Sequence, residues 1–271
     1  MSSRLTEILV ATSERLAEAR SRLPEPELRA RIKDLPPAQD FAAALTRPGR
    51  GSPGAAPLRV IAEIKRRSPS AGAIFEEVDP ASAAQALVTA GAAAISVVTE
   101  PHFFGGSLEA MAQVRAATSA PLLRKDFLLD SYQVLEARLY GADAVLLLAA
   151  VIDDGTIRQC VEEAERCGIA VLAEAHGEEE LERLIALGLP IIGLNARDLH
   201  SFEVDVERVL RWCEAIPSDR ISVAESGITT RAQADAVTAA PVDAALVGEG
   251  LMRGGDPAAR FRALFGMSAP A

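Results

Sequence analysis

From residue 60 onward the sequence repeats one pattern eight times: a short aliphatic stretch, a loop, an amphipathic stretch with helical spacing, and often a Gly or Pro. Short aliphatic stretches bounded by turn residues are typical of buried strands, and strands that alternate with helices form parallel sheets. The predicted strands are 60–65, 93–99, 121–125, 143–148, 170–174, 191–195, 221–225 and 244–248. The helices predicted to follow them are 80–90, 107–117, 131–140, 155–167, 178–187, 205–215, 231–239 and 257–264.

Eight such units in about 210 residues favour a closed (β/α)₈ TIM barrel over an open sheet. A doubly wound open sheet is the alternative, but the sequence lacks both the G-x-G-x-x-G turn after the first strand and a Walker-type loop. Four glycines come just past predicted helices, where a left-handed C-cap residue is favoured: Gly91, Gly141, Gly168 and Gly188.

An N-terminal helical extension precedes the barrel. Helices are predicted at 5–20, 27–33 and 41–45, followed by a loop at 47–57 that is rich in Gly and Pro and to which the sequence assigns no role. We expect a single domain of residues 1–271, with the extension and loop at 1–57 and the barrel at 58–271.

Composition excludes several classes of function. A net charge of −10 argues against nucleic acid or an anionic membrane as the main partner. Three cysteines and three histidines show no metal-ligand spacing, so we expect reduced thiols, no metal and a cytoplasmic protein. We also expect no signal peptide and no membrane span, because no apolar stretch has the required length and character.

Polar and ionisable residues gather where the predicted strands end. In a barrel, inward side chains at the carboxyl ends of the strands form the active face. Read in order, these ends carry Glu63 and Lys65, Thr99 and Glu100, Lys125 and Asp126, Glu174, Asn195 and Arg197, and Glu225, Ser226 and Gly227. Glu63 and Lys65 alone fit an ordinary buried ion pair equally well, but the concentration at five or more ends predicts a catalytic mouth.

The residue types indicate the chemistry of this mouth. Lys65, Lys125 and Arg197 supply positive charge for a carboxylate or phosphate. Lys125 can act as a proton donor or as a Schiff-base nucleophile, and spacing alone does not separate the two. Glu63 and Glu174 supply carboxylates that can serve as a base and an orienting partner.

The last two strands end in glycine-containing turns that predict a phosphate site. Ser226 and Gly227 follow the seventh strand, and Gly248 and Glu249 end the eighth. Loops at these positions of a barrel commonly bind phosphate through backbone N–H groups, and glycine permits close approach. Because Glu249 would repel a dianion, we expect its carboxylate to point away from the site.

Two loops carry three of the eight phenylalanines: Phe103 and Phe104 after the second strand and Phe127 after the third. Simple loop packing explains them as well as an apolar slot for a flat ring does.

Several motifs together resemble the indole-3-glycerol phosphate synthase family of tryptophan biosynthesis. They are IAEIKRRSPS at 61–70, FFGGS at 103–107, LRKDF at 123–127, AE at 173–174, IGLNARDL at 192–199, AESGI at 224–228 and VGEGLM at 247–252. The resemblance spans nearly the whole chain, the helical extension included.

The resemblance implies a carbon–carbon lyase that converts 1-(2-carboxyphenylamino)-1-deoxyribulose 5-phosphate to indole-3-glycerol phosphate, with loss of carbon dioxide and water and without a cofactor. Lys125 would protonate the sugar carbonyl, and Glu174 would be the acid and base of dehydration. Lys65 would hold the substrate carboxylate. Glu63 would orient Lys125 and a sugar hydroxyl, and Asn195 would help position the opened sugar.

The same resemblance assigns the remaining site residues. Arg197 would position the opened sugar and Glu174, and Glu225 is counted among the substrate-binding residues. The phosphate would rest on Ser68 and on backbone groups at Ser226, Gly227, Gly248 and Glu249. The residues implied to line the slot for the anthranilate ring are Phe104, Phe127, Leu146 and Leu199. The first helix would cover the ring with Ile8 or Leu9. The expected partner is a small phosphosugar, with no nucleic acid or membrane; tryptophan-pathway enzymes are possible partners. The alternatives are another phosphosugar barrel enzyme, such as an isomerase or Schiff-base aldolase, and a non-catalytic phosphosugar-binding barrel.

Overall fold

The molecule, seen in a computed structural model that describes residues 3–69, 71–197 and 204–266, is built on a closed barrel of parallel strands. Its strands are β1 (Arg59–Ile64), β4 (Ala94–Val98), β5 (Leu122–Lys125), β6 (Ala144–Leu148), β7 (Ala170–Ala175), β8 (Ile191–Asn195), β9 (Ile221–Glu225) and β10 (Ala244–Val247). Each strand pairs with the next one along the chain, and β10 pairs with β1 to close the ring. The predicted (β/α)₈ TIM barrel is confirmed.

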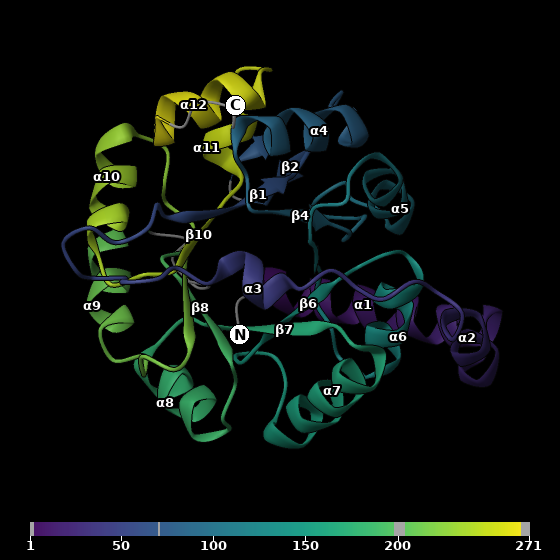
Figure 1. Ribbon diagram of the computed structural model, residues 1–271. Helices are drawn as coiled ribbons and strands as arrows, with labels where there is room; N and C mark the ends of the chain where they lie inside the picture. Colours follow the sequence, from purple (N-terminus) through teal and green to yellow (C-terminus); the bar gives the residue numbers. More distant parts are fainter. Residues whose placement is uncertain (1–2, 70, 198–203, 267–271) are drawn as a thin grey trace.

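A ring of helices surrounds the strands (Figure 1). They are α4 (Pro80–Ala90), α5 (Leu108–Ala117), α6 (Tyr132–Leu139), α7 (Asp154–Cys167), α8 (Glu178–Ala186), α9 (Val206–Cys213), α10 (Arg231–Ala239) and α12 (Pro257–Phe265). The four glycines predicted to end helices, Gly91, Gly141, Gly168 and Gly188, all have positive φ, which confirms that prediction.

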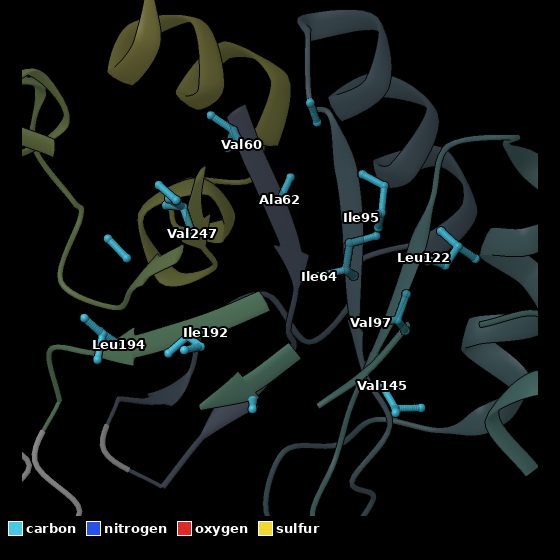
Figure 2. Close-up of a cluster of buried hydrophobic side chains, with 14 of the residues drawn as sticks. Val60, Ala62, Ile64, Ile95, Val97, Leu122, Val145, Ile192, Leu194 and Val247 are labelled. Carbon is cyan, nitrogen blue, oxygen red and sulfur yellow. The ribbon is translucent and has the colours of Figure 1, made fainter. Parts of the chain in front are cut away.

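Alternation along each strand divides the hydrophobic core into two layers. Val60, Ala62 and Ile64 of β1 point outward into the layer beneath the helices, as Figure 2 shows. Ile61 points inward and packs in the barrel interior with Leu123 and other inward residues. Because side chains alternate between faces, the next inward position of β1 after Ile61 is Glu63, at the carboxyl end. The same parity places charged residues of the other strands at this end.

The N-terminal extension consists of α1 (Ser3–Arg22), α2 (Glu25–Ile32) and α3 (Phe41–Leu45). Phe41 and Leu45 of α3 pack into the barrel interior, and α3 lies near the barrel centre in Figure 1. The loop at 47–57 is fastened by two arginines. Arg47 donates hydrogen bonds to the carbonyl oxygens of Val242 and Thr238, and Arg50 is ion-paired with Asp243.

Two short features were not predicted. An antiparallel hairpin, β2 (Arg67–Ser68) and β3 (Gly72–Ala73), follows β1, and a one-turn helix, α11 (Glu249–Met252), follows β10. Elements of two to four residues are too short to show a hydrophobic period in the sequence. Within the described ranges, no helix has both the length and the apolarity that crossing a membrane requires.

Candidate active site

A cavity of about 430 Å³ opens at the carboxyl ends of the barrel strands. Its lining includes the sequence-predicted residues Glu63, Lys65, Ser68, Phe104, Lys125, Phe127, Leu146, Glu174, Asn195, Arg197, Ser226, Gly227, Gly248 and Glu249. Leu199 lies outside the described residues. Glu225 is buried behind the lining, where it contacts the lining residues Lys125 and Glu174.

Lys125 lies between two buried carboxylates. Its Nζ donates hydrogen bonds to Glu174 Oε2 at 2.9 Å and to Glu225 Oε2 at 2.8 Å. Burial alone would lower the pKa of Lys125, but the carboxylates of Glu174, Glu225 and Glu63 raise it well above its ordinary value. Lys125 is therefore an ammonium ion: it holds a proton to donate, although the raised pKa makes it a weaker acid, and its nitrogen has no free electron pair for Schiff-base attack.

The pKa values of the two carboxyl groups beside Lys125 are shifted in opposite directions. Burial would raise the pKa of Glu174, but the charge of Lys125 and the contact with His176 hold it well below its ordinary value. Burial and the nearby Glu174 raise the pKa of Glu225 well above its ordinary value, although Lys125 opposes this. Two close carboxyl groups do not both ionise readily, so Glu174 carries the charge and Glu225 tends to keep its proton.

Glu174 is held by two further side chains. Asn195 Nδ2 donates a hydrogen bond to Glu174 Oε1 at 2.9 Å, and His176 Nε2 lies 3.0 Å from the same oxygen. The sequence analysis missed His176, which also lines the cavity. The available signal was its position two residues after Glu174, on the same face of the strand continuation.

Glu63 pairs with its own neighbour on β1. Its Oε1 lies 2.5 Å from Lys65 Nζ, while its Oε2 is buried and has no hydrogen-bond partner among the described residues. Both side chains line the cavity, so this is an ion pair within the site. The resemblance implied that Glu63 orients Lys125; the geometry gives Lys125 hydrogen bonds to Glu174 and Glu225 instead, and Glu63 acts on it through charge.

Strained backbone marks the far end of the cavity. Ser226 has φ of 68°, the only positive value for a non-glycine residue in the described ranges, and Gly227 follows with φ of 80°. Strain of this kind is often found at ligand clamps. Gly248 then caps α11. The Glu249 carboxylate is ion-paired with Arg253 at 2.8 Å and lies 3.6 Å from Arg197, so two arginines offset its charge and it does not simply point away.

An apolar slot lies beside the charged cluster. The rings of Phe104 and Phe127 are 6.2 Å apart between centroids, with Leu146 in the same lining. The backbone N–H groups of residues 102–104 donate to the buried carboxylate of Glu100, which fixes the loop that carries Phe104. These contacts order the loop, and they also place the two rings in the wall of the cavity as an apolar slot.

Helix α1 borders this slot and contacts the segment that follows strand β5. Leu5 and Ile8 line the cavity, and Ile8 is one of the two residues expected to meet the ring. Farther along α1, Arg15 donates to both carboxylate oxygens of Asp126, at 3.1 and 3.4 Å. Asp126 follows Lys125 directly and accepts from the backbone N–H of Phe127 at 2.9 Å. The covering helix therefore contacts the segment that carries the central ammonium.

No group of three or more His, Cys, Asp or Glu side chains in the described part of the chain is arranged to hold a metal ion. The site consists of one ammonium between carboxylates, a second ammonium–carboxylate pair, a strained glycine-containing turn and an apolar slot. Such an arrangement can donate and accept protons and bind an anionic, partly aromatic molecule.

Comparisons with known proteins agree with this chemistry. The family model described as indole-3-glycerol phosphate synthase matches residues 5–264. The chain is 41% identical over 266 residues to indole-3-glycerol phosphate synthase of Polaromonas naphthalenivorans, covering 98% of this chain and 100% of the relative. It is 44% identical over 259 residues to the protein of the same name from Micrococcus luteus, covering 96% of each chain.

Solved structures share the fold at low identity. The 3-hexulose-6-phosphate synthase of Salmonella typhimurium superposes with a TM-score of 0.63 at 14% identity, covering 77% of this chain and 97% of that one. The phosphoribosylanthranilate isomerase of Thermotoga maritima superposes with a TM-score of 0.55 at 18% identity, covering 76% and 96%. These two likenesses concern the barrel alone.

Proposed function

The chain belongs to the indole-3-glycerol phosphate synthase family of carboxy-lyases, and we propose that the charged cluster around Lys125 performs the family's ring closure on 1-(2-carboxyphenylamino)-1-deoxyribulose 5-phosphate. The observation that carries this assignment is the 2.9 Å contact between Lys125 Nζ and Glu174 Oε2 in a cavity that also has an apolar slot. A proton donor and a carboxylate base thus share one space.

Lys125 is the proton donor of the first step. The ring carbon that bears the carboxylate attacks the C2′ carbonyl of the opened sugar, and the carbonyl oxygen takes a proton from the Lys125 ammonium. Glu174 and Glu225 hold that ammonium in place, which avoids the cost of orienting it during the reaction. The amino-substituted ring is electron-rich, so carbon dioxide then leaves and the electron pair restores aromaticity.

Glu174 serves the dehydration that follows. Its carboxylate takes the proton that C1′ loses as the indole double bond forms, and passes that proton to the departing hydroxyl group, which leaves as water. Asn195 holds one carboxylate oxygen of Glu174 while the other faces Lys125, so the carboxylate cannot rotate freely. Groups fixed in this way are effective in general acid–base catalysis because their position is set before the substrate binds.

Two further anion-binding positions hold the ends of the substrate. Lys65 holds the substrate carboxylate, and the free Oε2 of Glu63 accepts a hydrogen bond from a sugar hydroxyl. The backbone N–H groups around Ser226, Gly227 and Gly248, with the Ser68 hydroxyl, bind the phosphate. Arg197 lies near this end of the site and positions the sugar.

The test is turnover of this substrate, followed by the fluorescence of the indole product. We expect wild-type enzyme to form it and Lys125→Ala to lose almost all activity while remaining folded by circular dichroism. Full turnover by Lys125→Ala would refute the assignment of the acid. Borohydride reduction in the presence of substrate should leave no covalent adduct on Lys125; an adduct would instead indicate Schiff-base chemistry.

A further inference from the structure

The proposed reaction consumes one proton in each turnover. The substrate carboxylate is an anion and leaves as neutral carbon dioxide. In the balance of steps, the carbonyl oxygen takes one proton and the departing hydroxyl takes a second, while C1′ returns one. The enzyme must therefore gain one proton from solvent before the next cycle.

The acid–base groups Lys125 and Glu174 have little direct access to solvent from which to take up this proton. Glu174 and Glu225 are 2% and 1% exposed. The Lys125 side chain is 20% exposed, but it is hydrogen-bonded to both carboxylates and faces the cavity that the substrate fills, with Leu5 and Ile8 of α1 in the cavity wall. A polar route from solvent to this cluster would restore the proton without full opening of the cavity.

His176 lies on such a route. Its side chain is 7% exposed, with Nε2 at 3.0 Å from Glu174 Oε1 and Nδ1 at 3.8 Å from Glu180 Oε2. Glu180, near the start of α8, has a side chain 26% exposed, and its Oε2 accepts a hydrogen bond from the His176 backbone N–H at 2.7 Å. Glu180, His176 and Glu174 therefore follow one another from the surface to the acid–base pair.

Neither ring nitrogen of His176 makes a hydrogen bond of good geometry in the described part of the chain. A buried imidazole that serves only packing would normally satisfy at least one nitrogen. Imidazole is also the side chain that gains and loses a proton most readily near neutral pH. The ring is thus placed between two carboxylates with both nitrogens available.

We propose that His176 and Glu180 form the proton inlet of this enzyme and, through Glu174, return one proton to Lys125 in each turnover. The inference rests on the proposed function, because only the net uptake of a proton creates the need. Glu180 takes a proton from water or buffer and passes it to His176 Nδ1. The imidazolium then gives its Nε2 proton to Glu174, Glu174 passes a proton to Lys125 Nζ across their 2.9 Å contact, and a ring flip restores the starting tautomer of His176. His176 acts through Glu174 and does not touch the substrate.

The 3.8 Å gap at Nδ1 is longer than a hydrogen bond, so this step requires a small rotation of Glu180 or one bridging water. The charged groups around the ring are Glu174 and Glu180 at first contact, and Lys125 from β5 and Glu225 from β9 behind Glu174. The immediate neighbours are therefore both carboxylates.

The experiment compares single-turnover with steady-state rates in His176→Gln, at low and high imidazole concentration and constant ionic strength. Single turnover starts from loaded enzyme, whereas steady state includes reloading. We expect the loss in steady-state rate at low imidazole to exceed the loss in single-turnover rate by about tenfold or more, and added imidazole to restore it. Glu180→Gln should show the same split in weaker form, and it provides the test if His176→Gln does not fold.

Three outcomes overturn the proposal. Steady-state turnover by His176→Gln equal to wild type at low imidazole would mean that the proton enters through the open cavity. Equal losses in both rates without rescue would mean a structural role. A Glu180→Gln variant without any split would remove the outer half of the route. Failure of wild-type enzyme to form the indole product would instead refute the proposed function, so the two failures are distinguishable.

Discussion

The carboxylate of Glu225 occupies the space that a side chain at position 193 would need. A Cβ built on Gly193 would lie 2.1 Å from Glu225 Oε1. Gly193 is on β8 and Glu225 on the adjacent β9. The absence of a side chain at 193 therefore lets Glu225 turn inward and reach Lys125.

Gly193→Ala should inactivate the enzyme without unfolding it. The new methyl group displaces the Glu225 carboxylate, and Lys125 then loses one of its two hydrogen-bond acceptors. We expect kcat to fall about 100-fold, a typical cost of misplacing catalytic groups by about 1 Å. Gly155→Ala is the matched control, because its Cβ would meet only ordinary contacts and should leave activity intact. Wild-type kcat in Gly193→Ala would show that the contact between Glu225 and Lys125 is not needed for activity.

Glu225→Gln should change the pH dependence of stability. The folded-state pKa of Glu225 is raised above its unfolded value, so its contribution to stability is complete below the ordinary Glu value and is lost as pH rises toward the folded value. The amide does not titrate. Wild type should therefore lose stability relative to Glu225→Gln as pH rises above the ordinary Glu value, measured by urea unfolding at each pH. A difference that stays constant, or that changes in the opposite direction, would contradict the raised pKa.

Glu174→Gln should leave substrate binding nearly intact and reduce kcat by about 100-fold or more, because the base is lost while its shape remains. The lowered pKa of Glu174 also predicts that the acid limb of the wild-type activity profile lies below the ordinary Glu value, since the carboxylate stays charged to lower pH. The measurement is kcat and KM over pH. An acid limb above the ordinary value would show that another group controls it.

Arg15→Ala should weaken the coupling between α1 and β5. It removes the bidentate contact with Asp126, but Arg124 still pairs with that carboxylate at 3.1 Å, so we expect a loss of only about 1–2 kcal/mol in unfolding free energy. The larger effect should be on kcat/KM, which we expect to fall about tenfold because Phe127 and helix α1 shift together. Arg20→Ala on the same helix is the control: its pair with Asp130 is exposed and worth little. Equal effects of the two variants would argue against a specific role for Arg15.

Lys65→Met should raise KM about 10- to 100-fold with a smaller change in kcat, since it removes a charged contact to the substrate carboxylate. The neighbouring Arg66→Met is the control, because Arg66 bonds to the backbone of Val78 and does not line the cavity. Steady-state kinetics measure both values. An effect confined to kcat would move Lys65 from substrate binding into the chemical steps.

The sequence predicted the barrel and the members of its active face well, because both depend on local patterns. Short aliphatic strands, their order and the two-residue alternation are written in consecutive residues, so Glu63, Lys125 and Glu174 could be assigned to one cavity before any coordinates. The same rule applied one step further would have found His176. The hairpin at β2 and β3 and the single turn of α11 were beyond reach, since a period cannot be read from so few residues.

The sequence by itself determined which side chains face the mouth of the barrel, because a strand turns every second residue to the same side whatever lies around it. Only the tertiary structure decided which of these side chains meet. Lys125 bonds to Glu225 because closure of the barrel brings β5 and β9 to one rim and Gly193 leaves the space open. Those distances depend on strand register, side-chain rotamers and empty volume, and none of these is a property of neighbouring residues in the chain.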